Sequence, residues 1–208
     1  MAQGFDDARD FWNQRFAVPE YIFGTEPNLF LTTQAQRFRS GDKVLDVACG
    51  EGRNSVWLAE RGCEVLGVDI SPLALEKARH LAAKRGVSVT FVEADIRDWQ
   101  WQPEAFDAVV CLFIQFAAPQ DRGHLFEGFK TTLKPGGVLL LQGYTPKQVE
   151  YKTGGPPQAE HMYTEAMLGA AFADIEILHL LEHEDVLHEG IKHVGRSALI
   201  DLVARKAS

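Results

Sequence analysis

A glycine turn directly after a short apolar run is the segment of this chain best suited to bind a ligand. Residues 44–49 read Val-Leu-Asp-Val-Ala-Cys and are followed by Gly50, Glu51 and Gly52. The apolar run predicts a buried strand, and the two glycines can adopt backbone angles that other residues avoid. A helix is expected from Asn54, so the turn predicts a loop whose backbone N–H groups can contact a small ligand.

Asp46 narrows the choice of ligand, because it places a carboxylate inside the strand just before the turn. Dinucleotide loops of the G-x-G-x-x-G type hold a pyrophosphate here, which a fixed negative charge would repel. Ser55 also stands where the third glycine of that motif would be. S-adenosylmethionine carries an ammonium and a sulfonium group and no phosphate. The sequence therefore favours this ligand over NAD(P).

A second acid, Asp69, ends the next apolar run at residues 64–69. At the tip of a second strand it is placed to accept hydrogen bonds from a ribose diol. NAD(P) has the same diol, so Asp69 does not discriminate between the two ligands. Taken singly, each feature has an alternative. Gly50 and Gly52 could form an ordinary turn between a strand and a helix, and Asp69 could merely precede the helix start at Ser71 and Pro72.

Length and composition predict one globular domain over residues 1–208. The chain is 46% hydrophobic and 24% charged, with a net charge of −8, which disfavours a nucleic-acid partner. No signal pattern or membrane-length apolar run is recognised, so we expect a cytoplasmic protein with no membrane partner. Three scattered cysteines predict buried thiols rather than disulfides. The oligomeric state stays open.

Strand and helix patterns alternate from Lys43 onward and end in a hairpin. Ser71 and Pro72 predict a helix start, and the Lys134-Pro135-Gly136-Gly137 segment predicts a helix stop with a tight turn. The expected strands cover residues 43–47, 64–69, 88–93, 106–113, 138–141, 175–184 and 197–205, and the expected helices cover residues 54–61, 72–86 and 121–133.

Together, these segments resemble the successive motifs of class I adenosylmethionine-dependent methyltransferases. The resemblance rests on Asp46-x-x-Cys49-Gly50-x-Gly52, Asp69, residues 93–96, 106–110 and 133–137. The Arg53-Asn54-Ser55 run is similar to the small bacterial group around tellurite-resistance, thiol and thiopurine methyltransferases. The resemblance implies an α/β, doubly wound, Rossmann-like fold. Its seven-stranded sheet would have the order 3-2-1-4-5-7-6, strand seven antiparallel and helices on both faces.

The resemblance also implies a role for each cofactor-site residue. Asp46 would lie near the cofactor ammonium, Asp69 would take the ribose and Asp95 the adenine amine. Asp95 has the alternative of a turn cap, and Cys111 and Phe113 that of core packing. The full set of expected cofactor residues is Asp46, Ala48, Gly50, Gly52, Asn54, Asp69, Ile70, Asp95, Ile96, Cys111 and Phe113.

The acceptor is expected to be a small molecule, such as a soft nucleophile. Residues 112–116 form an apolar wall and lack the Asn/Asp-Pro-Pro-aromatic run of many amino methyltransferases. A thiol, selenium or tellurium species needs no strong general base, whereas a carboxylate or hydroxyl acceptor would require Arg or His contacts. Residues 1–40, which include several aromatic residues, are expected to form a helical lid over the cofactor. The candidate acceptor residues are Tyr21, Phe116, Arg122, His188 and Arg196.

Five of the seven histidines follow residue 160, and His193 is the candidate catalytic residue among them. A loop at residues 188–196 would bring His193 to the site, where it could accept a proton or orient the acceptor. A hydrogen-bonded turn histidine is the alternative. The histidine spacing does not predict a metal site. Two other functions stay open at this point: a noncatalytic adenosylmethionine-binding protein and an NAD(P)-dependent oxidoreductase.

Overall fold

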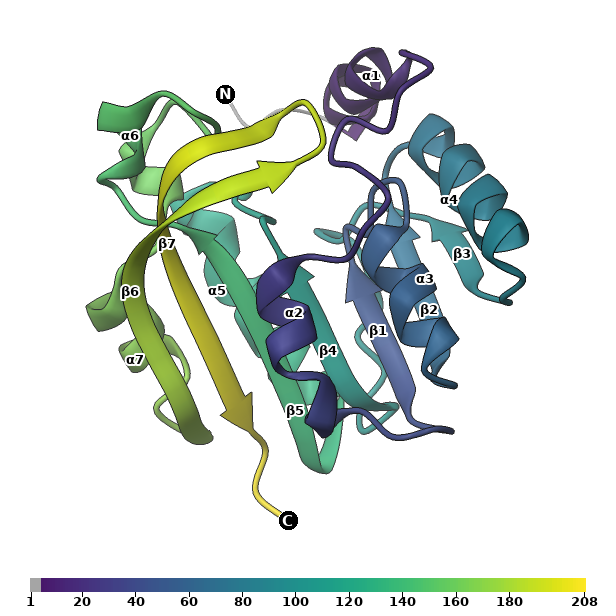
Figure 1. Cartoon of the computed structure of the whole chain (residues 1–208). Coiled ribbons are helices and arrows are strands. Elements are labelled where there is room, and N and C mark those ends of the chain that lie inside the picture. The colour runs from purple at the N-terminus through teal and green to yellow at the C-terminus, as the bar shows by residue number, and fades with distance from the viewer. Residues whose placement is uncertain (1–4) are drawn as a thin grey trace. The chain divides into compact units, whose positions relative to one another are not determined.

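The computed structural model describes residues 5–208, which form two compact units (Figure 1). Unit 1 contains residues up to Gln100 together with Glu189–Ile191, and unit 2 contains Trp101–His188 and Lys192–Ser208. The single domain expected over residues 1–208 stays a prediction.

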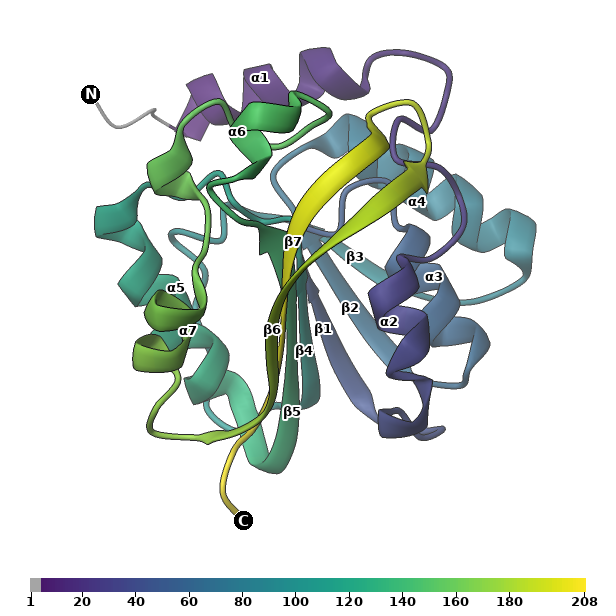
Figure 2. The same ribbon diagram turned by 60° about the vertical axis from the view of Figure 1, so that its left-hand side comes forward.

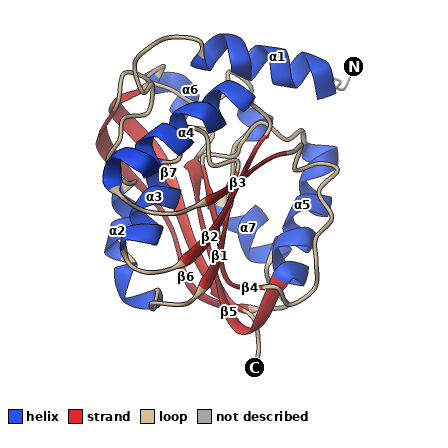
Figure 3. Ribbon diagram, turned by 90° about the vertical axis from the view of Figure 1, so that its right-hand side faces the viewer, coloured by secondary structure: helices blue, strands red, loops and turns tan. Residues whose placement is uncertain are grey.

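Unit 1 is built on three parallel strands. β1 (Lys43–Val47) pairs with β2 (Glu64–Asp69), and β2 pairs with β3 (Thr90–Glu93). The connecting helices α3 (Arg53–Glu60) and α4 (Pro72–Arg85) lie on the same side of these strands (Figure 3). This is the arrangement that right-handed βαβ crossovers produce. Predicted cofactor residues lie at or directly after the ends of all three strands.

Local signals explain why α4 begins and ends where it does. The Ser71 hydroxyl accepts a hydrogen bond from the Ala74 backbone N–H at 3.2 Å, and Pro72 opens the helix. Gly86 ends it in the left-handed conformation, with φ of 71°. The capping oxygen and the early proline lower the free-energy cost of starting the helix, and the terminal glycine lowers the cost of ending it. The predicted helix at residues 72–86 is thereby confirmed.

The chain before β1 is helical. α1 (Phe5–Phe16) is followed by α2 (Leu29–Thr33) and a short 3₁₀ helix, η1 (Ala35–Arg37). Phe16 packs with Ile22 and with Ala74 of α4, and Trp12 and Phe23 contact this cluster. The aromatic residues of the N-terminal segment therefore attach α1 to the body of unit 1.

Unit 2 is built on an open sheet with a long terminal hairpin (Figure 2). Its central strands are fully buried, as residues 109–111 and 139–141 illustrate with 0% exposure. β5 pairs antiparallel with β7. The elements of unit 2 are β4 (Phe106–Leu112), α5 (Pro119–Thr132), β5 (Leu133–Tyr144), α6 (Gln148–Tyr151), η2 (Ala159–His161), α7 (Glu165–Ala171), β6 (Glu176–Glu189) and β7 (His193–Arg205).

The strands follow the order β3-β2-β1-β4-β5-β7-β6, with β7 antiparallel, as the resemblance implied. Some bounds differ from the prediction. β5 begins at Leu133 rather than at residue 138, because the expected tight turn is an irregularity inside the strand. Its register to β4 shifts from Leu133 to Val138, and Gly136 has φ of 76°.

The expected loop at residues 188–196 was wrong. β6 continues to Glu189 and β7 begins at His193, so the turn between the two strands is residues 190–192. His193 is therefore the first residue of a strand. In the described part of the chain, no helix has both the length and the apolar character that crossing a membrane requires.

We predict that Gly52→Ala destabilises the fold more than Gly86→Ala. Both glycines have positive φ, so each substitution should cost about 1–2 kcal/mol of conformational strain. At Gly86 a Cβ meets nothing within 4 Å, whereas at Gly52 it would lie 2.6 Å from the Ala78 Cβ. This overpacking should add about 1–3 kcal/mol, measurable by urea unfolding. Equal losses for the two variants would contradict the expected close packing of the turn on α4.

Candidate functional site

The glycine turn after β1 has positive φ at three alternate positions along its length. Ala48, Gly50 and Gly52 have φ of 51°, 55° and 82°. The Cys49 N–H donates to the Val68 carbonyl and the Gly52 N–H to the Cys49 carbonyl, both at 3.0 Å. Gly52 then caps α3. Among the described residues, a Cβ at Gly50 would meet only the Phe16 ring, at 3.7 Å, so a ligand can approach this backbone closely.

Two buried carboxylates flank this turn. Asp46 in β1 is 2% exposed and accepts a hydrogen bond from the Ser55 hydroxyl at 2.5 Å. Asp69 at the end of β2 is 6% exposed and accepts from the backbone N–H of Gly50 at 2.8 Å and of Ser71 at 2.9 Å. A carboxylate has acceptor capacity beyond these bonds. The predicted pair of acids is thus brought together around one loop.

Burial raises the pKa of both carboxylates. The pKa of Asp46 rises to about 7, chiefly through burial and further through the charge of Asp69, while the Ser55 hydroxyl opposes the rise. The pKa of Asp69 rises to about 6, again through burial, although backbone N–H donors oppose it. The ionised forms are therefore incompletely stabilised by the protein itself. A cationic ligand would supply the missing stabilisation.

Helix α1 crosses the ends of the three strands of unit 1. Arg9 pairs with Glu93 at the end of β3 at 2.8 Å, and the Ser71 hydroxyl donates to Asn13 Oδ1 at 2.6 Å. Phe16 lies next to Gly50, beyond the end of β1. Positions 9, 13 and 16 share one face of a helix. These contacts support the lid expected at residues 1–40, which stays a prediction.

Glu51, at the centre of the glycine turn, was missed by the sequence analysis. It is 3% exposed and pairs with Lys77 of α4 at 2.8 Å. Lys77 Nζ also donates to the Glu20 carbonyl, and the Tyr21 hydroxyl donates to the Lys77 carbonyl at 3.0 Å. The signal that could have revealed Glu51 is an acid between two glycines. Tyr21, a candidate acceptor residue, thus contacts α4 in this structure.

The remaining predicted cofactor residues of unit 1 have defined partners. The Asn54 Oδ1 accepts from the backbone N–H of Asn28 at 2.9 Å. Asp95, 7% exposed, accepts from the backbone N–H of Arg97 at 2.9 Å and from its guanidinium. Ile96 is buried and Ile70 is half-buried. The turn-cap alternative for Asp95 is therefore realised, and its adenine contact stays a prediction.

Unit 2 gathers three rings that we call the aromatic cluster: Phe113, Tyr144 and His193. The Phe113 ring lies 4.4 Å from the His193 ring and 4.9 Å from the Tyr144 ring, centroid to centroid. Phe113 has φ of 60°, which is strained for a bulky residue, and its N–H donates to the Gln142 carbonyl at 2.8 Å. His193 is 8% exposed. Strain of this kind concentrates at functional sites, so the cluster is a candidate acceptor site.

Gln115 supports the aromatic cluster and was not predicted as a functional residue. Its side chain donates to the Tyr144 carbonyl at 2.7 Å and accepts from the Tyr144 N–H at 2.5 Å. A Cβ at Gly143 would lie 2.7 Å from the Gln115 side chain, so glycine is required there. The single amide within the apolar wall was the available signal. Phe116, beside it, is 37% exposed, and Cys111 is fully buried in β4.

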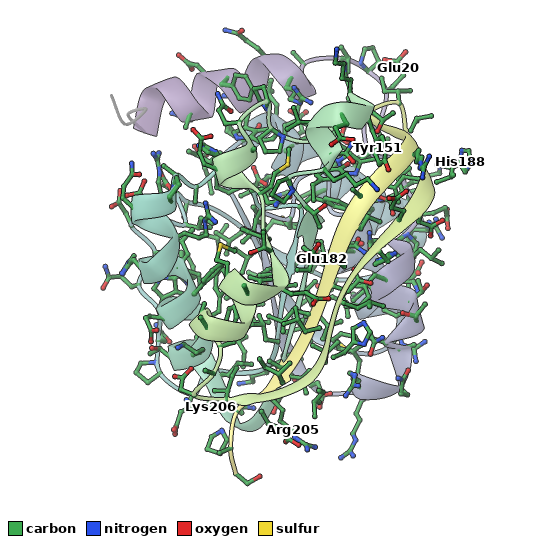
Figure 4. The ribbon with its side chains drawn as sticks, turned by 90° about the vertical axis from the view of Figure 1, so that its left-hand side faces the viewer. Glu20, Tyr151, Glu182, His188, Arg205 and Lys206 are labelled. Atoms are coloured by element: carbon green, nitrogen blue, oxygen red, sulfur yellow. The ribbon has the colours of Figure 1, made fainter. Side chains whose placement is uncertain are left out.

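The two candidate arginines are occupied by other contacts. Arg122 is buried, donates to the Met162 carbonyl and to Met167 Sδ, and lies 5.5 Å from the Tyr163 ring. Arg196 donates to Glu184 at 2.8 Å and lies over the Tyr151 ring. His188 is exposed and points outward from the hairpin (Figure 4). The structure therefore does not gather these three residues with His193.

Within the described residues, no three or more His, Cys, Asp or Glu side chains are arranged to hold a metal ion. His183 instead contacts Asp201 at 3.0 Å, and Gln142 donates to the same carboxylate at 2.7 Å. Burial raises the pKa of Asp201, and these two contacts oppose the rise. His183 thus has a local partner within the sheet of unit 2.

Comparisons with known proteins agree with this geometry. Residues 44–137 match the family described as "Methyltransferase domain". The chain is 36% identical over 114 residues to a carboxy-S-adenosyl-L-methionine synthase of Aliivibrio fischeri (51% of this chain, 47% of the relative). It is 36% identical over 106 residues to a ubiquinone biosynthesis O-methyltransferase of Actinobacillus pleuropneumoniae (49% and 45%). The chain spans about half the length of the curated relatives it matches.

Solved structures extend the likeness to nearly the whole chain, at the level of the fold. TehB from Haemophilus influenzae superposes with a TM-score of 0.71 at 21% identity, covering 96% of this chain and 67% of TehB. A structure from the conversion of a disulfide bond into a thioacetal group during echinomycin biosynthesis gives 0.79 at 17% identity, covering 96% and 92%. Residues 44–137 are thus similar to a methyltransferase domain, and the solved structures share the fold over nearly the whole chain.

We predict that Asp46→Asn becomes more stabilising, relative to the parent, as the pH rises from about 4 to about 7. The folded-state pKa of Asp46, about 7, lies above its ordinary value of 3.8, so folding opposes its ionisation. The cost is absent below pH 4 and complete above pH 7, and it should grow by up to about 1.4 kcal/mol per pH unit between them. Urea unfolding of both proteins across this range measures the difference.

Ser55→Ala provides the matched control for this prediction. Its hydroxyl stabilises the Asp46 carboxylate, so its removal should shift the same window to higher pH. A stability difference between Asp46→Asn and the parent that does not change with pH would contradict the raised pKa.

Proposed function

We propose that this chain, which has the class I fold and carries a methyltransferase domain, transfers the methyl group of S-adenosylmethionine to a small-molecule acceptor. The observation that carries the proposal is the pair of buried carboxylates, Asp46 and Asp69, on either side of an open glycine turn. Their raised pKa values favour a cationic ligand over a phosphate-bearing one. The same pair argues against an NAD(P)-dependent oxidoreductase.

The residues of unit 1 fit the cofactor in their chemistry. The open backbone at Gly50 suits close approach of the methionine portion, and Asp46 would offset its ammonium. Asp69 would share its remaining acceptor capacity with the ribose diol. When bound, the cofactor supplies a methyl group already activated by a sulfonium. The protein then has to bind, orient and exclude water. The proposed adenine contacts are Ile70, Asp95 and Ile96, and the proposed carbonyl contacts to the ammonium are Cys111 and Phe113.

We propose a soft, uncharged or anionic nucleophile, such as a thiol, selenium or tellurium species, as the acceptor. The aromatic cluster and the half-exposed Phe116 offer an apolar, polarizable surface. A carboxylate acceptor would need a cationic contact, yet Arg122 and Arg196 are engaged with other groups. The relatives reported above are a carboxy-S-adenosyl-L-methionine synthase and an O-methyltransferase of ubiquinone biosynthesis, so they support S-adenosylmethionine chemistry only in general terms.

His193 is proposed as the residue that orients the acceptor or accepts its proton. His193 and the Tyr144 phenol are the two titratable groups of the aromatic cluster, and the His193 ring is buried against Phe113. A thiol with a pKa near neutrality would need little help, whereas a hydroxyl would need a base. The lack of a nucleic-acid partner is a further proposal, supported by the net charge of −8. A cytoplasmic location is proposed as well.

We predict that Asp69→Ala weakens binding of S-adenosylhomocysteine by about 10- to 100-fold, because each lost charge-assisted hydrogen bond costs about 1.5–3 kcal/mol. Isothermal titration calorimetry measures the affinity, and thermal unfolding checks that the fold persists. NADH is titrated in parallel. Tight NADH binding without S-adenosylhomocysteine binding would overturn the proposed function, and unchanged affinity would leave Asp69 as a helix-start residue.

We predict that His193→Ala lowers the methyl-transfer rate or raises the acceptor KM while S-adenosylhomocysteine affinity stays nearly the same. A general-base role predicts a rate loss on the order of 10²-fold or more, and a positioning contact predicts less. Turnover is measured over thiols, selenite, tellurite, carboxylates, phenols and amines. Parental rates for every accepted compound would show that the acceptor is recognised elsewhere, and no turnover with intact cofactor binding would indicate a noncatalytic binding protein.

A further inference from the structure

The turn between β6 and β7 docks onto the N-terminal segment by direct backbone contact. We call residues 189–191 the docked turn; they belong to unit 1, although β6 and β7 otherwise belong to unit 2. The Ile191 N–H donates to the Ile22 carbonyl at 2.9 Å. A Cβ at Gly190 would lie 2.4 Å from both the Gly24 nitrogen and the Ile22 oxygen, so the contact requires glycine. Figure 1 shows this turn beside the chain that leaves α1.

Glu189 adds a buried ion pair to the docked turn. Its carboxylate accepts from the Arg53 guanidinium at 2.7 Å and from Asn28 Nδ2 at 3.1 Å. The Arg53 and Glu189 side chains are only 8% and 11% exposed. Burying two charges costs desolvation, so such a pair is a poor way to gain stability alone. The ion pair does, however, specify that Arg53 and Glu189 lie together, because either side chain alone would be a buried charge without compensation.

The partners of Glu189 belong to the segment that forms the proposed methyl-donor site. Arg53 and Asn54 open α3 directly after Gly52. Asn28 joins the same network, because its backbone N–H donates to Asn54 Oδ1 at 2.9 Å while its own side chain caps α2. The docked turn is therefore fastened to the first turn of the helix that follows the glycine loop.

One of the other ion pairs of β6, at the far end of the strand, has a different character. Glu176 pairs with Arg205 at 2.6 Å, but these side chains are 56% and 46% exposed. Exposed pairs of this kind contribute little and fix little. The buried contact of Glu189 is thus the one that restricts the hairpin at its turn.

Resting on the proposed function, we propose that Glu189 is a positioning residue that couples the methyl-donor loop to the acceptor-side hairpin. Through Arg53 and Asn28 it anchors the docked turn. His193 follows Glu189 by four residues, and so short a chain limits the freedom of its ring once Glu189 is held. Ordering of the donor loop by a ligand then also orders the turn, and the coupling acts equally in both directions.

Hydrogen–deuterium exchange of the amides at residues 186–194 tests the proposal in the full chain, with and without S-adenosylhomocysteine. In the parent, the ligand should slow exchange of these amides. In Glu189→Gln, exchange without ligand should be at least about 10-fold faster, and the ligand-dependent slowing should largely disappear. The affinity of Glu189→Gln for the ligand should fall by no more than the factor by which the ligand slows exchange in the parent.

Two further variants separate positioning from general stability. Gly190→Ala prevents docking by backbone clash without changing any charge, and should reproduce the loss of ligand-dependent slowing. Glu176→Gln removes the exposed ion pair of the same strand and should behave as the parent does at residues 186–194.

The outcomes distinguish this proposal from the proposed function. A parent protein that binds no S-adenosylhomocysteine overturns the proposed function and the coupling with it. A parent that binds the ligand without any change in exchange at the turn overturns the coupling alone. Retention of the ligand effect in Glu189→Gln would show that the ion pair serves the fold only.

Discussion

The burial of two carboxylates at neighbouring strand ends is the constraint on which the donor site of this protein depends. Asp46 and Asp69 are nearly inaccessible to water, and this burial raises the free-energy cost of ionising each carboxyl group. The Ser55 hydroxyl and the N–H groups of Gly50 and Ser71 offset only part of that cost. The part of the cost that remains favours a cationic ligand, as the proposed function requires. The Phe16 ring lies beside Gly50 at the same loop.

Each residue of the glycine turn has its own specific contact, because the neighbouring residues pack closely around the turn. Gly52 must be glycine for its left-handed conformation and for its contact with Ala78, while Gly50 must present bare backbone. Glu51, between them, is directed to Lys77, and Arg53 to Glu189. The turn is thus held from two sides by buried ion pairs whose partners lie on α4 and on the docked turn. A loop with so few free positions is preorganised, and a preorganised loop loses less entropy when a ligand binds.

Local signals explain which parts could be predicted from the sequence. The cap at Ser71, the proline after it and Gly86 determine α4 without help from distant residues. The bounds of β6 and β7 could not be predicted in this way, because both strands continue into residues that resemble a loop locally: β6 runs to Glu189, and β7 already includes His193 and Gly195. Arg53 and Glu189 are 136 residues apart, and neither has a pattern that names the other. Arg122 looked like a substrate contact, but its partners at residues 160–167 become apparent only after folding.

The contrast between the two sets of charged residues bears on acceptor chemistry. On the proposed donor side, Asp46 and Asp69 accept hydrogen bonds from uncharged donors, namely the Ser55 hydroxyl and the N–H groups of Gly50 and Ser71. Arg122 and Arg196 of unit 2 contact carbonyls, sulfur, rings or Glu184. The aromatic cluster offers polarizable ring faces to the proposed acceptor, and His193 is the group in it that can change charge near neutral pH. That property suits a nucleophile whose reactivity resides in a soft atom, and it leaves proton transfer as the one step in which the protein needs a titratable side chain.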